Sequence, residues 1–217
     1  MNKFIKNEWF SIMLLIIPFI IGIILYPSLP DQMPTHWNFK GEVDQYSSRN
    51  FGTFFFPALN VFMYLTLLLA PKLDPKKENY EKFATSYKFI RVTLLVFLVF
   101  MYILTLYASL GYKVDMGLWI SVGVSLLFIG LGNVLGRVRH NYFVGIRLPW
   151  TLANEKVWKK THYVGSKAMV AGGVFSLLGV ILTTDVYRFI FLMVGIFVPL
   201  IFVSIYSYVY YKKLKNN

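Results

Sequence analysis

Six long apolar runs follow one another along this chain, and none of them contains Asp, Glu, Lys, Arg or His. An α-helix rises about 1.5 Å per residue, so about 20 residues cross the roughly 30 Å hydrocarbon core of a bilayer. The pattern therefore predicts an all-α, integral membrane protein with six transmembrane helices, of which the fifth is the shortest. The predicted spans are about Trp9–Leu29, Thr53–Pro71, Val92–Leu110, Gly117–Gly136, Ala168–Thr184 and Phe189–Tyr210.

The connections between the runs differ greatly in length. Those near Gly111–Met116 and Thr184–Arg188 are too short for anything but tight turns, so spans three and four, and spans five and six, should be antiparallel neighbours in a helix bundle. We expect three regions along the chain. They are residues 1–71, with two spans and the loop 30–52; residues 72–116, with a loop and the third span; and residues 117–217, with three spans and the loop 137–167.

The basic residues orient the predicted bundle. Of 22 Lys and Arg residues, all but Lys40, Arg49, Lys113 and Arg188 lie in the terminal segments or in and beside the loops 72–88 and 137–167. Cytoplasmic loops of membrane proteins carry such an excess. The ten acidic residues divide equally between the two sides, so the asymmetry comes from Lys and Arg alone. Both termini and the loop 137–167 are therefore predicted to be cytoplasmic, and the loop 30–52 external.

The first run follows a short basic segment, as the apolar core of a secretory signal does. This run, Trp9–Leu29, is longer than the core of a usual signal, and no A-x-A cleavage pattern follows it. We therefore expect a retained span.

Composition agrees with a multi-pass protein of the cell membrane whose main partner is the lipid bilayer. Hydrophobic residues make up 57% of the chain and charged residues 15%, against about 45–50% and about 25% in soluble domains. The net charge of +12 could indicate nucleic acid, but the basic residues form no separate domain, so direct nucleic-acid binding is not expected. Cysteine is absent, which excludes disulfides and thiolate sites.

Polar residues inside the spans are few. The absence of charge there disfavours a proton-driven pump, because such proteins mark their path with buried ionisable groups. Asn60 and Asn133 are the most polar side chains in the runs and suit hydrogen bonds between helices. Together with Pro18 and Pro199, which can kink their helices, they leave one alternative function open, a small transporter or exporter of an apolar or neutral molecule.

The predicted external loop 30–52 is rich in proline and should be extended and stiff. Trp37 suits the membrane interface. His36 has Asp44 and other acids near it in sequence, but no short His–carboxylate spacing is present, so no metal site is expected. We expect this loop to fold on its own helix ends, with contact to an external ligand or peptide as the alternative.

The predicted cytoplasmic loop 137–167 contains the segment "NYFVGIRLPWTLANEKVWKK". Pro149 should hold Leu148 in an extended conformation. Thr151 then stands where an N-cap would, ahead of a helix over about 152–162. Two tryptophans and several lysines in this segment suit an interfacial helix bound to anionic lipid headgroups, and a docking surface for a cytoplasmic partner is the alternative.

Catalysis is not expected, and neither is a cofactor. The two histidines of the cytoplasmic loop are 22 residues apart with one carboxylate between them. No nucleophile–base pattern, phosphate-binding loop or paired acid motif is present. The chain is therefore predicted not to be an enzyme.

The loops 137–167 and 30–52 resemble those of a known family, the SdpI-type membrane proteins of Gram-positive bacteria. Its late cytoplasmic loop reads roughly N-x-x-x-G-x-R-x-P-W-T-L-x-x-x-x-V-W. A short domain of unknown function, with P-x-x-x-P-x-H-W and a later G-x-x-D, often precedes it. The residues that match are Asn141, Gly145, Arg147, Pro149, Trp150, Thr151, Leu152, Val157 and Trp158 in the first pattern, and Pro30, Pro34, His36, Trp37, Gly41 and Asp44 in the second.

The resemblance implies an immunity protein that protects against a secreted, membrane-disrupting toxin peptide. It also implies a receptor role, in which the toxin-bound protein holds a small winged-helix autorepressor at the membrane. On this basis the matching residues of the external loop are expected to face the toxin. Those of the cytoplasmic loop, Asn141, Gly145, Arg147, Pro149, Trp150, Thr151 and Trp158, are expected to bind a partner or repressor.

Overall fold

The computed structural model describes residues 3–216, and the side chains from Glu8 onward. The elements in chain order are α1 (Lys3–Leu25), a 3-10 turn η1 (Tyr26–Ser28), β1 (Gln32–Trp37), β2 (Val43–Ser48), α2 (Arg49–Leu73), a 3-10 segment η2 (Lys77–Phe83), α3 (Ala84–Ser109), α4 (Met116–Leu135), α5 (Pro149–Ala153), α6 (Glu155–Leu182) and α7 (Asp185–Asn216). Six helices of this described part are long and apolar enough to cross a membrane. The predicted all-α membrane bundle is therefore confirmed.

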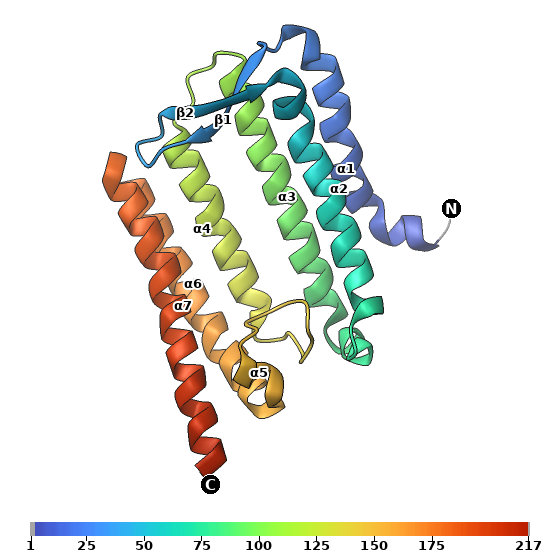
Figure 1. The fold of residues 1–217 in the computed structure, drawn as a ribbon, viewed down its shortest axis with the longest axis vertical. Helices are drawn as coiled ribbons and strands as arrows, with labels where there is room; N and C mark the ends of the chain where they lie inside the picture. The colour runs from blue at the N-terminus through green and yellow to red at the C-terminus, as the bar shows by residue number, and fades with distance from the viewer. Residues whose placement is uncertain (1–2, 217) are drawn as a thin grey trace.

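The helices form two groups joined by the contact between α3 and α4. Helices α1, α2 and α3 pack together on one side, and α4, α6 and α7 on the other (Figure 1). The short connections do make α3 and α4, and α6 and α7, antiparallel neighbours, as the sequence predicts. The two strands lie across one end of the bundle, which we call the hairpin end. The segment η2, the residues 136–148, α5 and the C-terminal end of α7 lie at the other end, which we call the loop end.

The proline-rich segment 30–52, predicted to be extended and folded on its own helix ends, forms a β-hairpin packed on the bundle. Strands β1 and β2 pair antiparallel, from Gln32 opposite Ser48 to Trp37 opposite Val43, with irregular register between them. Met33 on β1 is fully buried, and a Cβ on Gly52 of α2 would come within 2.8 Å of its side chain. This contact packs the hairpin onto the bundle, because only glycine leaves room for the methionine.

Prolines inside the helices free backbone carbonyl groups, and side chains of neighbouring helices donate hydrogen bonds to two of these carbonyls. Pro18 has no N–H to donate to the carbonyl of Leu14. The side-chain amide of Asn60 on α2 donates to that oxygen at 3.1 Å. The structure thus confirms an interhelical hydrogen bond for Asn60. Asn133, in contrast, is exposed on α4, and no hydrogen bond joins its side chain to another described residue, so the same prediction is wrong there.

The same hydrogen-bonded arrangement recurs at Pro71, and a close helix contact covers the freed carbonyl at Pro199. Pro71 frees the carbonyl of Leu67, and the hydroxyl of Tyr87 on α3 donates to it. Pro199 frees the carbonyl of Gly195, and Gly172 of α6 lies so close that a Cβ there would be 2.1 Å from this oxygen. Because a bilayer offers no water to an unpaired carbonyl, the hydrogen bonds from Asn60 and Tyr87 let α1 and α2 contain proline. They also fix which face of each helix meets its neighbour.

Removing the amide at position 60 should destabilise the bundle only while Pro18 is present. We expect Asn60→Ala to lower the free energy of unfolding by about 1 kcal/mol, a typical value for an interhelical hydrogen bond in a membrane protein. In a Pro18→Ala background the backbone N–H of residue 18 can bond to Leu14, so the cost should fall. Thermal unfolding in detergent of the two single variants and the double variant measures this coupling. Equal losses in both backgrounds would contradict the pairing.

A buried ion pair lies directly beside the uncharged runs, inside the helix bundle. The six apolar runs are uncharged, but α1 and α3 extend beyond them and bring Glu8 and Arg91 into the bundle. Arg91 Nη2 contacts Glu8 Oε1 at 2.5 Å, and both side chains are at most 10% exposed. Tyr64 donates to Glu8 Oε2 at 3.4 Å, and its ring centroid is 5.5 Å from the Arg91 guanidinium carbon. These three side chains tie together α1, α2 and α3.

Candidate functional site

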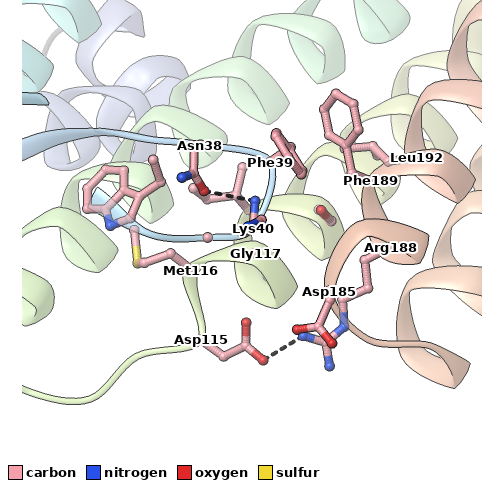
Figure 2. Close-up of a pocket in the computed structure, with 14 residues that line it drawn as sticks. Asn38, Phe39, Lys40, Asp115, Met116, Gly117, Asp185, Arg188, Phe189 and Leu192 are labelled. Carbon is pink, nitrogen blue, oxygen red and sulfur yellow. Dashed lines mark hydrogen bonds and ion pairs between the residues drawn. The ribbon is translucent and has the colours of Figure 1, made fainter. Parts of the chain in front are cut away.

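A pocket of about 350 Å³ opens at the hairpin end, beneath the turn that joins β1 to β2 (Figure 2). The hairpin turn forms one wall, and the first turns of α4 and α7 form the others. Apolar and charged side chains are mixed around it. The lining residues are Trp37, Asn38, Phe39, Lys40, Gly41, Asp115, Met116, Gly117, Ile120, Ser121, Asp185, Arg188, Phe189 and Leu192.

The hairpin turn is shaped by Asn38 and Gly41. The side-chain oxygen of Asn38 accepts hydrogen bonds from the backbone N–H groups of Lys40 at 2.8 Å and Glu42 at 3.1 Å. Gly41 has φ +81°, and a Cβ there would lie 3.0 Å from the backbone nitrogen of Gly117. The turn therefore needs glycine both for its left-handed backbone and for its close approach to α4.

The floor of the pocket is an ion pair that joins three helix ends. Asp115 caps α4, because its Oδ1 accepts from the backbone N–H of Leu118 at 2.9 Å. Its Oδ2 contacts Arg188 Nη1 of α7 at 2.6 Å, as Figure 2 shows. Arg188 Nε also donates to the carbonyls of Val180 and Thr183 at the end of α6. The guanidinium thus neutralises the carboxylate and satisfies carbonyls that the helix leaves unpaired.

The structure brings only two of the predicted external-loop residues into this pocket, Trp37 and Gly41. Pro34 is buried in β1, and Pro30 is exposed just before that strand. His36 and Asp44 face each other across the hairpin, with 2.5 Å between Nδ1 and Oδ1. Nowhere among residues 3–216 do three His, Asp or Glu side chains gather closely enough to hold a metal ion.

Sequence reasoning missed the residues of the pocket that come from the short connections. Asp115 and Arg188 are 73 residues apart, and Phe39 lies 6.2 Å from Phe189 between ring centroids although 150 positions separate them. The one signal in the sequence was that Arg188 and Lys40 are among the four basic residues of the side that is otherwise poor in them.

At the loop end, Asn141 holds the segment after α4 in a compact turn. Its side-chain oxygen accepts from the backbone N–H groups of Phe143 at 2.9 Å and Val144 at 2.7 Å. Its amide donates to the carbonyls of Arg139 and Val144. Asn141 is fully buried, and its side-chain hydrogen bonds here hold the loop together.

Asp74, at the end of α2, fixes this turn from a second direction. Its Oδ2 accepts from the backbone N–H of Tyr142 at 2.8 Å and from the hydroxyl of Tyr80 at 2.9 Å. Lys76 Nζ lies 3.1 Å from His140 Nδ1. Burial, with the nearby Lys76 ammonium, lowers the pKa of His140 below its usual value. The neutral ring can therefore accept a hydrogen bond from the Lys76 ammonium at Nδ1. This bond attaches the loop to the segment between α2 and α3.

Gly145 and His162 form the centre of the loop. Gly145 has φ +119°, and a Cβ there would lie 2.3 Å from His162 Nε2. That nitrogen accepts from the backbone N–H of Ile146 at 3.0 Å, and Nδ1 faces the carbonyl of Trp158 at 2.9 Å. This pattern fits a neutral ring with its proton on Nδ1. His162 stacks on Trp158 with ring centroids 4.0 Å apart.

Trp158 is only 1% exposed, so its predicted place among the lipid headgroups is wrong. Its indole N–H donates to the carbonyl of Val138 at 3.0 Å, which secures the end of α4. Trp150 is half-buried and donates to the hydroxyl of Ser207 on α7 at 2.7 Å. Both tryptophans therefore bond to protein groups, because the loop folds back on the helix ends.

The predicted interfacial helix is also corrected. Thr151 lies inside the short α5, with Leu148 extended before it as Pro149 requires. The Thr151 hydroxyl accepts from the N–H of Leu148 at 2.9 Å and donates to the carbonyl of Ile146 at 2.8 Å. The cap of the next helix is Asn154, and that helix, α6, continues without a break into the fifth span.

Arg147 and Pro149 remain exposed, as do the neighbouring Tyr142 and Phe143. Arg147 Nη1 donates to the carbonyl of Tyr142 at 2.8 Å and so connects two parts of the loop that are five residues apart. We call these four residues the loop surface. Their exposed side chains are within reach of a partner while the loop stays folded.

The fold and the two end regions define a multi-pass protein of the cell membrane. The profile of a domain of unknown function, DUF1648, matches residues 13–61, and that of the SdpI/YfhL protein family matches residues 137–207. Over 212 residues the chain is 30% identical to the Immunity protein SdpI of Bacillus subtilis (strain 168), covering 98% of this chain and 99% of that protein. The chain belongs to the SdpI family, which is not a family of enzymes, and its own role is non-catalytic. No solved structure matches it.

Proposed function

We propose that this protein confers immunity against a secreted, membrane-active toxin peptide, and that the pocket at the hairpin end meets the toxin. The hairpin end then faces outward and both termini face the cytoplasm, in agreement with the distribution of Lys and Arg. The observation that carries the proposal is the composition of the pocket. Its wall from the hairpin belongs to the region that matches DUF1648, and its wall from α7 belongs to the region that matches the SdpI/YfhL family.

The lining of the pocket suits an amphipathic peptide. Phe39 and Phe189 are exposed aromatic rings at its rim, and Lys40, Asp115 and Arg188 supply charges of both signs. Aromatic rings supply the large contact areas that dominate binding energy at interfaces. The hairpin and the helix ends hold these groups in place, so little ordering entropy is lost on binding.

Phe39→Ala should reduce protection more than Phe51→Ala. Both phenylalanines are exposed at the hairpin end, but only Phe39 lines the pocket. We would express each variant in a Bacillus subtilis strain that lacks its own SdpI, and measure survival in spent medium of the parent strain. Truncating an aromatic contact costs about 1–2 kcal/mol, so the toxin concentration that the cells survive should fall about tenfold for Phe39→Ala. If the native chain gives survival no better than an empty vector, the immunity proposal is contradicted. If Phe39→Ala and Phe51→Ala lose equal protection, the proposed role of the pocket in meeting the toxin is contradicted.

We further propose that the loop surface retains a small cytoplasmic autorepressor at the membrane when toxin is bound. An exposed arginine beside two exposed aromatic rings is the composition that favours a protein partner. Arg147→Ala combined with Phe143→Ala should leave membrane insertion intact and abolish co-sedimentation of a winged-helix repressor with toxin-treated membranes. Unchanged co-sedimentation would refute this role of the loop surface.

A further inference from the structure

A second hollow of about 370 Å³ lies at the loop end, between the end of α4, the first turns of α6 and the last turns of α7. Three of its six lining residues are lysines, and no acidic residue lines it. The lining is Gly136, Lys156, Lys159, Lys160, Tyr163 and Tyr210. All three lysines are exposed, and they stand in the first turns of a 28-residue helix, whose dipole adds to the positive potential there. Glu155 lies in an adjoining hollow that shares Lys156 and Lys159.

The depth of this hollow along the bundle follows from the helix lengths. The 20 residues of α4 measure about 30 Å, so Gly136 directly after it lies at the edge of the hydrocarbon core. Counting 20 residues back from Leu182, at the other end of α6, reaches Tyr163, which therefore lies at the same level. The lysines at positions 156–160 lie about 5–10 Å further out. That distance places them among the lipid phosphates, because the headgroup region adds about 5–8 Å on each side of the core.

We propose that this hollow, the lysine pocket, binds the headgroup of an anionic phospholipid. The three lysine ammonium groups take the phosphate, and the rings of Tyr163 and Tyr210 border the start of the acyl chains, at the level where tyrosine gathers in membrane proteins. Lys167 Nζ lies 4.5 Å from the centroid of the Tyr163 ring and holds that ring in place. Exposed apolar side chains further along α6 towards the hairpin end, among them Phe175 and Leu178, continue the surface for the acyl chains.

This site is separate from the pocket at the hairpin end and from the loop surface, since it shares no residue with either. The bound lipid joins the ends of α4, α6 and α7 at the loop end. The Asp115–Arg188 pair joins the same three helices at the hairpin end. An anion in the lysine pocket also relieves the repulsion among the three lysine charges that line it.

The test uses the purified full chain in neutral detergent, titrated with phosphatidylglycerol, phosphatidylcholine or inorganic phosphate. The triple variant Lys156→Gln, Lys159→Gln, Lys160→Gln should bind phosphatidylglycerol about tenfold more weakly than the native chain. The matched control, Lys72→Gln, Lys77→Gln, Lys82→Gln, removes the same charge from exposed lysines at the same end and should keep the native affinity. Unchanged thermal midpoints without lipid show that each variant is folded.

Two further outcomes separate the sources of phosphate. Tyr163→Ala keeps all three lysines and should weaken binding of phosphatidylglycerol without changing binding of inorganic phosphate. Equal affinity for phosphatidylglycerol and phosphatidylcholine, or equal losses in the two triple variants, would overturn the proposal. Inorganic phosphate that displaces phosphatidylglycerol at similar concentration would assign the lysine pocket to a soluble anion instead, which also overturns it.

Discussion

Arg91→Met is expected to lower the free energy of unfolding by about 3–5 kcal/mol, because it leaves the Glu8 carboxylate buried without its partner. For a chain of this size the midpoint of thermal unfolding in detergent should fall by roughly 10 °C. The double variant Glu8→Leu, Arg91→Met removes both charges and replaces them with apolar groups. It should recover most of the loss, since a buried ion pair often contributes little beyond what a well-packed apolar pair supplies.

The chain offers a matched control for this experiment. Arg49 contacts Asp31 at 2.6 Å and lies 5.4 Å from the ring centroid of Tyr26, nearly the same arrangement as that of Arg91 with Glu8 and Tyr64. The Asp31 side chain, however, is 92% exposed. Arg49→Met should therefore cost less than about 1 kcal/mol. If the two arginine variants lose equal stability, burial is not what makes the Glu8–Arg91 pair important.

Gly145→Ala is expected to destabilise the loop end by about 2–4 kcal/mol, from backbone strain together with the loss of a buried hydrogen bond. The backbone at this position has φ +119°, which L side chains rarely adopt. The added Cβ would also meet His162 Nε2 at 2.3 Å and push the ring away from the N–H of Ile146. The melting midpoint should fall by roughly 5–10 °C, and hydrogen exchange should accelerate first at Ile146 and its neighbours.

Gly111→Ala separates the two causes. Gly111 has a left-handed backbone as well, with φ +84°, but nothing lies within 4 Å of an added Cβ. This variant should show the cost of backbone strain alone, about 1 kcal/mol. A drop at position 145 no larger than the drop at position 111 would mean that the contact with His162 does not organise the loop.

A match to the family pattern does not by itself show whether a side chain of the loop binds a partner or stabilises the loop. Asn141, Gly145, Thr151 and Trp158 match the pattern, and each is occupied with folding the loop. Their assignment as a binding surface stays a prediction. Arg147 and Pro149 are the matching residues whose side chains are exposed. A substitution at the buried Asn141 or Trp158 would therefore test the stability of the loop before it tested recognition.

The sequence alone determined the six spans, their order and which of them are antiparallel neighbours. These follow from quantities that a single chain carries along its length, namely the thickness of a bilayer, the rise of a helix and the shortness of two connections. The sequence also provides the uneven distribution of Lys and Arg on which the predicted orientation rests.

Only the tertiary structure decided what surrounds each polar side chain. Asn60 binds the carbonyl that Pro18 leaves free, whereas Asn133, equally polar in sequence, is exposed on α4. Glu8 and Arg91 lie outside the uncharged runs and are nevertheless buried against each other. The pocket at the hairpin end depends on Gly41, Asp115 and Arg188, which belong to three separate connections. Contacts of this kind depend on how helices rotate and how turns fold over their ends, and no local pattern in the chain encodes that geometry.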